Sequence, residues 1–192
     1  MRTNTARKAT MATFAVLAVV AASVGLYASL TTEPKTTIVN NSLMVATKVD
    51  LLKETDVAFI GTVTTTETRK AVSSTRPGEE DILTRAAFNV DRFIFNPHHT
   101  TNREISLDFL GGTVGKDTLM VEGQELPIVG ERMVIFTKLQ DDGSLKIQMP
   151  SHGVYHIDEN GRLGVGEMEK SVAQMIFGKD VSVDQLEAML AE

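Results

Sequence analysis

The fold is decided by residues 57–63, Val-Ala-Phe-Ile-Gly-Thr-Val, in the first half of a chain of 192 residues. The segment is short, apolar and rich in β-branched side chains, and the threonines at positions 64–66 continue the preference for an extended backbone. We therefore predict a central β-strand that begins at Val57.

A second long strand is predicted after Val72–Asp81, a segment whose serines, proline, glycine and acidic residues are typical of a solvated loop. Residues 82–95 place apolar side chains on both parities of one extended run. One face of a strand cannot stay regular over that length, so we expect strong curvature or a bulge. Residues 105–109 then alternate apolar and polar side chains, as a half-buried strand does.

Further short strands are predicted toward the C-terminus, with tight turns at residues 141–143 and 158–161. Their ranges are 119–121, 133–139, 145–149, 154–157 and 163–165. About seven or eight short antiparallel strands at this spacing indicate a mainly β fold, either an OB-type barrel or a sandwich.

Two capping signatures predict short helices on either side of the strands. Thr47 followed by Asp50 predicts a helix that ends near Thr55. Ser182 and Gln185 form a second capping box, and the apolar side chains that follow share one helical face. We expect this short C-terminal helix to pack against the β domain.

The first thirty residues have the pattern of an export signal. Residues 11–30 carry no charge and follow a leader whose only charges are Arg2, Arg7 and Lys8. A bilayer is spanned by ~20 residues, so length does not separate a removable signal peptide from a retained signal-anchor helix. The small residues at 20–22 favour cleavage. In either case the rest of the chain is expected outside the cytoplasm.

Charge and cysteine content exclude several classes of function. The leader holds three of the nineteen basic residues and none of the twenty-five acidic ones, so the remainder carries a net charge of −9 against −6 for the whole chain. A surface this acidic repels phosphate backbones, which argues against nucleic-acid binding. The absence of cysteine excludes disulfides, thiol catalysis, thiolate zinc sites and covalent haem attachment.

These patterns divide the chain into four parts. Residues 1–30 are the signal peptide or anchor helix, and the Thr- and Asn-rich residues 31–42 are a linker. Residues 43–168 form the β-barrel domain, and residues 169–192 form a helical tail.

The candidate metal ligands are the four histidines, His98, His99, His152 and His156. His152 and His156 have the spacing of a helical metal pair, but Gly153 and the surrounding residues indicate a strand. On a strand, residues four apart place their Cα atoms about 13 Å from each other, too far to share a zinc ion unaided. We therefore assign none of the four as a metal ligand and predict no cofactor.

Three other patterns suggest chemistry but are explained more simply. The glycine-rich residues 111–118 lack the spacing and the following helix of a phosphate-binding loop, so we interpret them as a hairpin or crossing loop. Ser151 and His152 are neighbours on extended chain and face opposite ways, unlike a nucleophile and its base. The acidic pairs at 141–142 and 158–159 lack the spacing of a calcium loop and are expected to serve their turns.

The order of elements over residues 46–110 resembles the opening of netrin-like domains and of tissue inhibitors of metalloproteinases. The similarity is carried by the short helix and by the segments 56–63, 88–95 and 104–109. It implies a closed OB-type barrel. Those inhibitors place an N-terminal cysteine on the protease zinc, and this chain has no cysteine. The resemblance therefore extends to the barrel and not to the inhibitory mechanism.

With no catalytic motif, we expect an exported, non-catalytic binding or interaction module, either secreted or held to the membrane through residues 11–30. The expected partner is another protein or a cell-envelope component. Candidate contact surfaces are the loops Val72–Asp81, Asn96–Asn102 and Gly111–Lys116. Two alternatives stay open: an exported hydrolase whose histidines or carboxylates converge only in the fold, and a structural subunit in which Thr36–Val45 adds a strand to a neighbour's sheet.

Overall fold

Nine strands and three helices make up the part of the chain that this computed structural model describes, namely residues 34–39, 47–147, 152–164 and 166–190. The fold is mainly β, as the sequence predicts. The leader at residues 1–30, with the helix expected in it, lies outside the described residues. Within them, no helix has both the length and the apolar character needed to cross a membrane.

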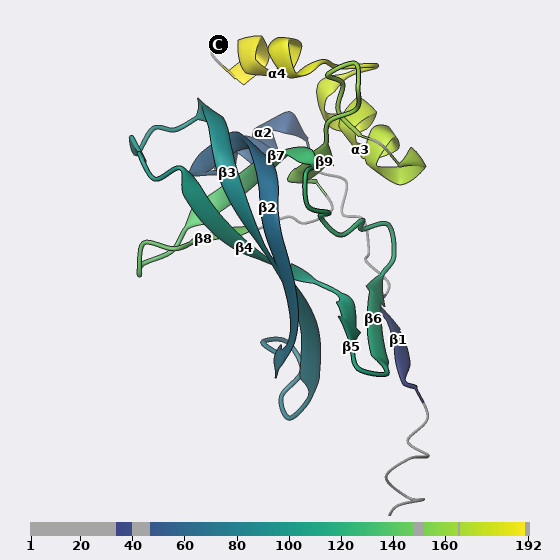
Figure 1. Cartoon of the computed structure of the whole chain (residues 1–192). Coiled ribbons are helices and arrows are strands. Elements are labelled where there is room, and N and C mark those ends of the chain that lie inside the picture. Colours follow the sequence, from purple (N-terminus) through teal and green to yellow (C-terminus); the bar gives the residue numbers. More distant parts are fainter. Residues whose placement is uncertain (1–33, 40–46, 148–151, 165, 191–192) are drawn as a thin grey trace, which may run out of the picture. The chain divides into compact units, whose positions relative to one another are not determined.

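The larger sheet is antiparallel and contains two long strands, β2 (Val57–Val72) and β3 (Glu80–Phe95). Its hydrogen-bonded order is β4–β3–β2–β7–β8, and β9 also pairs with β7. The other strands are β4 (Glu104–Leu110), β7 (Arg132–Leu139), β8 (Leu145–Ile147) and β9 (Val154–His156). The register of β2 against β3 shifts at three points between Ala58 and Thr65, which confirms the expected bulges. Figure 1 shows the β2–β3 hairpin extending beyond the rest of the sheet.

The first part of β2, residues 57–61, and residues 133–137 of β7 are buried on both faces. Ala58 and Ile60 of β2 belong to one hydrophobic cluster, together with Val134 and Phe136 of β7. Their chain neighbours, including Phe59 and Ile135, belong to a second cluster on the opposite face. Successive residues of a strand face opposite ways, so the unbroken apolar runs at 57–60 and 133–136 supply two separate cores.

Three helices cover the first of these clusters: α2 (Lys48–Lys53), α3 (Glu167–Phe177) and α4 (Val183–Leu190). Figure 1 shows them gathered at one end of the larger sheet. The ring of Phe177 stacks on Phe136 with centroids 6.0 Å apart and meets Tyr155 edge-on at 5.6 Å. These contacts fix α3 against β7 and β9.

Both predicted capping boxes are present. Thr47 and Asp50 exchange side-chain and main-chain hydrogen bonds at the start of α2. Ser182 and Gln185 do the same before α4, and Leu186 is fully buried, so the C-terminal helix packs as expected. Helix α3 has no such signature because its N-cap is Gly166, which provides no side-chain hydrogen bond. It lies largely within the predicted helical tail at 169–192, but the sequence predicts no separate helix there.

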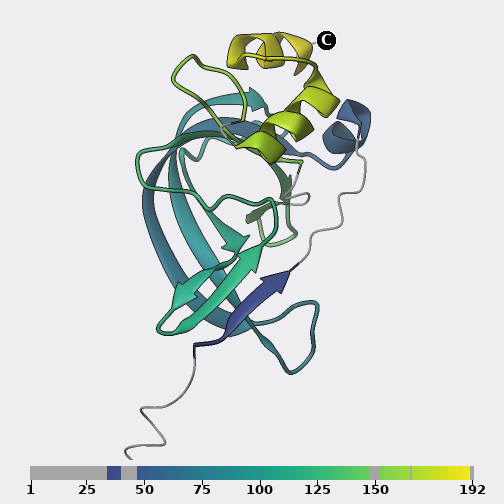
Figure 2. The same cartoon turned by 90° about the vertical axis from the view of Figure 1, so that its right-hand side faces the viewer.

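The smaller sheet has the order β1–β6–β5 and is formed by β1 (Thr36–Val39), β5 (Gly112–Val114) and β6 (Asp117–Val121). The β5–β6 hairpin confirms the interpretation of the glycine-rich segment. Strand β1 lies beside β6 (Figure 2) and pairs with it in parallel, the one parallel pair among the described strands of an otherwise antiparallel fold. Residues 36–39 of the predicted linker form this strand. A four-residue strand held by main-chain hydrogen bonds needs no apolar period, so only the structural-subunit alternative predicted a strand here.

The remaining predicted strands differ in detail. Leu163 forms only an isolated bridge with Ile157, so the described residues of 163–165 are not a strand. Residues 148 and 149 of the predicted strand 145–149 lie outside the described ranges. Among the described strands, no main-chain pairing joins β4 to β8, so hydrogen bonds do not close the larger sheet.

Candidate functional site

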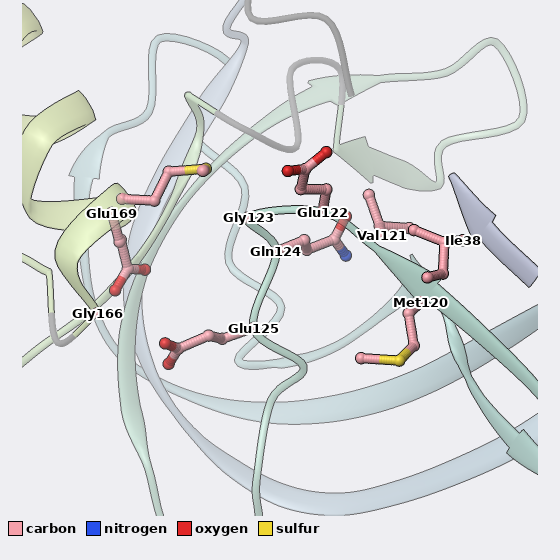
Figure 3. Close-up of a pocket in the computed structure, with 10 residues that line it drawn as sticks. Ile38, Met120, Val121, Glu122, Gly123, Gln124, Glu125, Gly166 and Glu169 are labelled. Atoms are coloured by element: carbon pink, nitrogen blue, oxygen red, sulfur yellow. The ribbon is translucent and has the colours of Figure 1, made fainter. Parts of the chain in front are cut away.

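An open cavity of about 520 Å³ lies between the end of β6 and the start of α3, and we call it the β6–α3 cavity. Its lining residues are Ile38, Met120, Val121, Glu122, Gly123, Gln124, Glu125, Gly166, Met168 and Glu169. Large apolar side chains are exposed here: Ile38 at 66%, Met120 at 55% and Met168 at 41%. Figure 3 shows Ile38 and Met120 on one side of the cavity and Glu125 and Glu169 on the other.

The apolar side of the cavity is set by strand pairing. Ile38 of β1 and Met120 of β6 are register partners. Leu119 is buried, and its neighbour Met120 faces outward because side chains alternate along a strand. The pairing continues past the strand, where the main-chain N–H of Glu122 donates to the carbonyl of Val39 at 3.0 Å. At this hydrogen bond, the chain passes from the apolar side of the cavity to its acidic side.

Two glycines allow the loop after β6 to lie against the start of α3. Gly123 has a φ of +75°, and a Cβ added there would lie 1.8 Å from Sδ of Met168. A Cβ on Gly166 would lie 2.3 Å from Oε1 of Glu125. Met168 therefore rests on the backbone of Gly123, and the Glu125 carboxylate rests at the N-cap of α3. A side chain at either position would push these groups apart.

His156, the last residue of β9, lies between two carboxylates from other elements. Its Nδ1 is 3.0 Å from Oε1 of Glu169 on α3, and its Nε2 is 3.3 Å from Oε2 of Glu131, just before β7. Its main-chain N–H also donates to Glu169 at 2.8 Å. Glu169 lines the β6–α3 cavity, whereas Glu131 and His156 line a second cavity of about 250 Å³. The imidazole therefore links Glu169, which lines the β6–α3 cavity, to Glu131, which lines the second cavity.

The surroundings of His156 favour its charged form. Burial lowers its pKa, but the hydrogen bond and charge of Glu169 raise it, with smaller contributions from Glu131 and Glu125. The net result is a pKa above the ordinary value of 6.5. Because both ring nitrogens face carboxylates, the ring is not arranged as in a catalytic triad, where one nitrogen faces the nucleophile.

The fold does not gather the four histidines into one site. His98 and His99 lie in the β3–β4 loop, where Nε2 of His98 is 3.6 Å from Oδ1 of Asp56. His152 is buried in the turn before β9, and its carbonyl accepts a hydrogen bond from the hydroxyl of Tyr155 at 2.6 Å. Ser151 lies outside the described residues. In the described part of the chain, no group of three or more His, Cys, Asp or Glu side chains is placed to hold a metal ion.

Two of the four acidic turn residues, Asp142 and Asp158, serve their turns, as the sequence predicts. Oδ1 of Asp142 accepts hydrogen bonds from the main chain and hydroxyl of Ser144. Oδ1 of Asp158 accepts from the main-chain N–H groups of Asn160 and Arg162. These bonds lower the pKa of both aspartates, with the Ser144 hydroxyl and the Arg162 amide as the main causes.

The three candidate contact loops lie outside the β6–α3 cavity. Residues 73–79 of the predicted loop Val72–Asp81 join β2 to β3, and the loop is bonded internally, since Arg76 pairs with both Glu79 and Asp81. Asn96–Asn102 is held by two hydrogen bonds between Asn96 and Thr100. Gly111–Lys116 contains β5 and the turn that leads into the cavity strand β6.

No protein-family model matches this sequence, and no curated protein matches it.

The residues that line the cavity could not be predicted from the sequence. They come from three separate segments, residue 38, residues 120–125 and residues 166–169, which only the fold brings together. The one local signal is Glu122-Gly123-Gln124-Glu125, a glycine between acidic residues after a predicted strand. That pattern is typical of a solvated turn, so it does not point to a cavity.

Proposed function

We propose that this chain is a non-catalytic binding module that acts outside the cytoplasm and contacts its partner through the β6–α3 cavity. One observation carries the proposal: an open cavity of about 520 Å³ with Ile38, Met120 and Met168 exposed on its lining. Binding cavities of proteins have volumes of about 300–1,000 Å³ and are mostly apolar with a few placed polar groups. Apolar side chains gathered in a concave surface are typical of a contact site.

Location and partner class are part of the same proposal. The uncharged residues 11–30 behind a basic leader support export, with the leader either removed or retained as a membrane anchor. The acidic character of the remainder makes a protein or a cell-envelope component a better partner than a nucleic acid.

The proposed architecture is a partly open OB-type barrel of netrin-like kind. The strand order β4–β3–β2–β7–β8 supports it. So does a cavity of about 180 Å³ lined by both edges of that order, with Ile105 from β4 and Leu145 from β8. OB barrels have five strands, are partly open and commonly serve as binding scaffolds.

Export is tested by fractionating cells that express the full-length chain and determining the mass of its N-terminus. We expect the chain outside the cytoplasm, either shortened near residues 20–22 or intact in the membrane. An intact, water-soluble chain in the cytosol would overturn this part of the proposal.

Binding is tested by NMR of methionine methyl groups in the full-length chain, kept in a neutral detergent. The probe is the uncharged peptide acetyl-Leu-Gln-Leu-amide, and single Met→Leu variants assign the signals. We expect the Met120 and Met168 signals to shift with saturation, because these side chains line the cavity. Exposed Met175 and buried Met133 lie outside it and are the internal controls.

Two results would overturn the binding proposal. One is an absence of shifts at Met120 and Met168 or an equal shift at all four methionines. The other is cleavage of the peptide, detected by mass spectrometry, which would favour the alternative of an exported hydrolase.

A further inference from the structure

The two sides of the β6–α3 cavity differ in chemistry. Ile38 and Met120 form an apolar side, and Glu125 and Glu169 stand opposite them (Figure 3). Resting on the proposed function, we infer that the occupant is a segment of a partner protein that carries a lysine or arginine beside apolar side chains.

The carboxylates of the cavity differ from the paired carboxylates of the larger sheet. There, cations of the same sheet neutralise the acids: Asp108 pairs with Arg69 and Arg85 at 3.0 and 2.9 Å, and Asp91 pairs with Arg132 at 3.0 Å. These pairs are formed within the chain and leave little charge for a partner.

At the cavity, the corresponding cations are missing. Among residues 34–39, 47–147, 152–164 and 166–190, no basic side chain forms an ion pair with Glu122 or Glu125. Glu169 is compensated by His156. Within the described residues, Glu122 and Glu125 therefore stand at an apolar cavity without a lysine or arginine partner, and only the weaker attraction between Glu125 and His156 acts on them. A cation from outside complements them.

The Glu125 carboxylate rests at the N-cap of α3. Its Oε1 lies 2.3 Å from the place that a Cβ on Gly166 would take. The positive end of an eleven-residue helix favours a carboxylate at this point.

The apolar side makes a side-chain cation a better occupant than a metal ion. Lysine and arginine have aliphatic stems that cover apolar surface while the charged end reaches a carboxylate. Exposed methionines adapt to such stems. A metal ion would find no group of three suitable ligands within the described ranges.

The experiment compares two peptides, acetyl-Leu-Lys-Leu-amide and the same peptide with its lysine acetylated, on the full-length chain by methionine methyl NMR. Acetylation removes the charge and keeps the apolar stem. We expect the charged peptide to bind about tenfold more tightly than the acetylated one, which is the contribution of two solvent-exposed ion pairs to binding. High salt should remove this difference, because it screens the charges.

Variants of the chain locate the effect. Glu125→Gln and Glu122→Gln are each expected to weaken binding of the charged peptide about two- to fivefold and to leave the acetylated peptide unchanged. Glu104→Gln, on β4 outside the cavity, is the matched control and is expected to change neither. An unchanged signal of buried Met133 verifies the fold in each variant.

The outcomes separate this inference from the proposed function. Equal binding of both peptides at Met120 and Met168 would overturn the inference and leave the binding site standing. Binding that weakens equally in all three glutamate variants would also overturn it, because the attraction would then come from overall charge. No shift with any peptide would overturn the proposed function itself.

Discussion

Protonation of the His156 ring is coupled to the position of α3, because the ring contacts Glu169 on that helix. The ring faces Glu131 and Glu169, and these carboxylates raise its pKa against the effect of burial. A group whose pKa is higher in the folded than in the unfolded chain stabilises the fold fully below the unfolded value. That stabilisation is lost as the pH rises through the folded pKa.

We therefore predict that His156→Asn lowers the free energy of unfolding by about 1.5–3 kcal/mol near pH 6, the size of a hydrogen bond to a charged group. The difference from the unmodified chain should shrink as the pH is raised to 9. Urea unfolding at a series of pH values measures it.

The matched control is His99→Asn, which replaces a loop histidine whose φ of 53° asparagine accepts. It should not reproduce the pH-dependent difference. A stability difference for His156→Asn that stays constant from pH 6 to 9 would contradict the role of the imidazolium.

Gly123 predicts a second residue-scale effect. Gly123→Ala should lower the free energy of unfolding by about 1–2 kcal/mol because its backbone is left-handed, and it should also displace Met168. Gly143→Ala is the control, since Gly143 has a similar φ of +81° and nothing within 4 Å of an added Cβ. Both variants should lose similar stability in urea, and only Gly123→Ala should move the Met168 methyl signal. The same movement in Gly143→Ala would contradict the contact.

At the scale of elements, the pairing of β1 with β6 distinguishes a strand that stays within its own chain from a strand that is given to a neighbouring chain. Thr36–Val39 pairs with β6 of the same chain, whereas the structural-subunit alternative gives this strand to a neighbour. Exchange of one strand between identical chains is a common route to dimers. The chain has no cysteine, so an engineered pair reports the pairing without background.

We predict that the double variant Ile38→Cys and Met120→Cys forms a disulfide within one chain on mild oxidation. Paired positions on neighbouring strands have the Cα separation that a disulfide needs. Non-reducing electrophoresis should show a monomer, and the single variants serve as controls. Disulfide-linked dimers of the double variant alone would instead support strand exchange.

Elements with strong local signals could be predicted from sequence, and the others could not. The strands around residues 57–63 and 133–139 follow from long apolar runs, and α2 and α4 follow from their capping boxes. Strand β1 and helix α3 lack such signals, because main-chain pairing holds one and a glycine caps the other. Since these two elements supply Ile38, Met168 and Glu169, the candidate site depends on the elements that sequence patterns miss.

At the scale of the whole molecule, β2 and β7 are shared by both hydrophobic clusters, so neither cluster can open while the other stays intact. We predict that amides of residues 57–61 and 133–136 exchange their hydrogens most slowly. Those of residues 74–79 at the hairpin tip should exchange fastest of the described loops, because these residues are mostly exposed. Hydrogen-exchange mass spectrometry of the full-length chain measures both. Faster exchange at 133–136 than at 57–61 would show that β7 opens while β2 stays protected, which would contradict the prediction.

The two-faced burial of β2 also fixes its alignment from both sides. Ala58 and Ile60 fit the space beneath the helices, and Phe59 fits the space on the other face. A slip of one residue would place the phenylalanine ring where an alanine methyl group now sits and leave a void on the opposite side. A register shift of a strand that is buried on one face disrupts the packing of one core. The same shift of β2 would disrupt two cores at once, and the register of the strands paired with β2 is fixed with it.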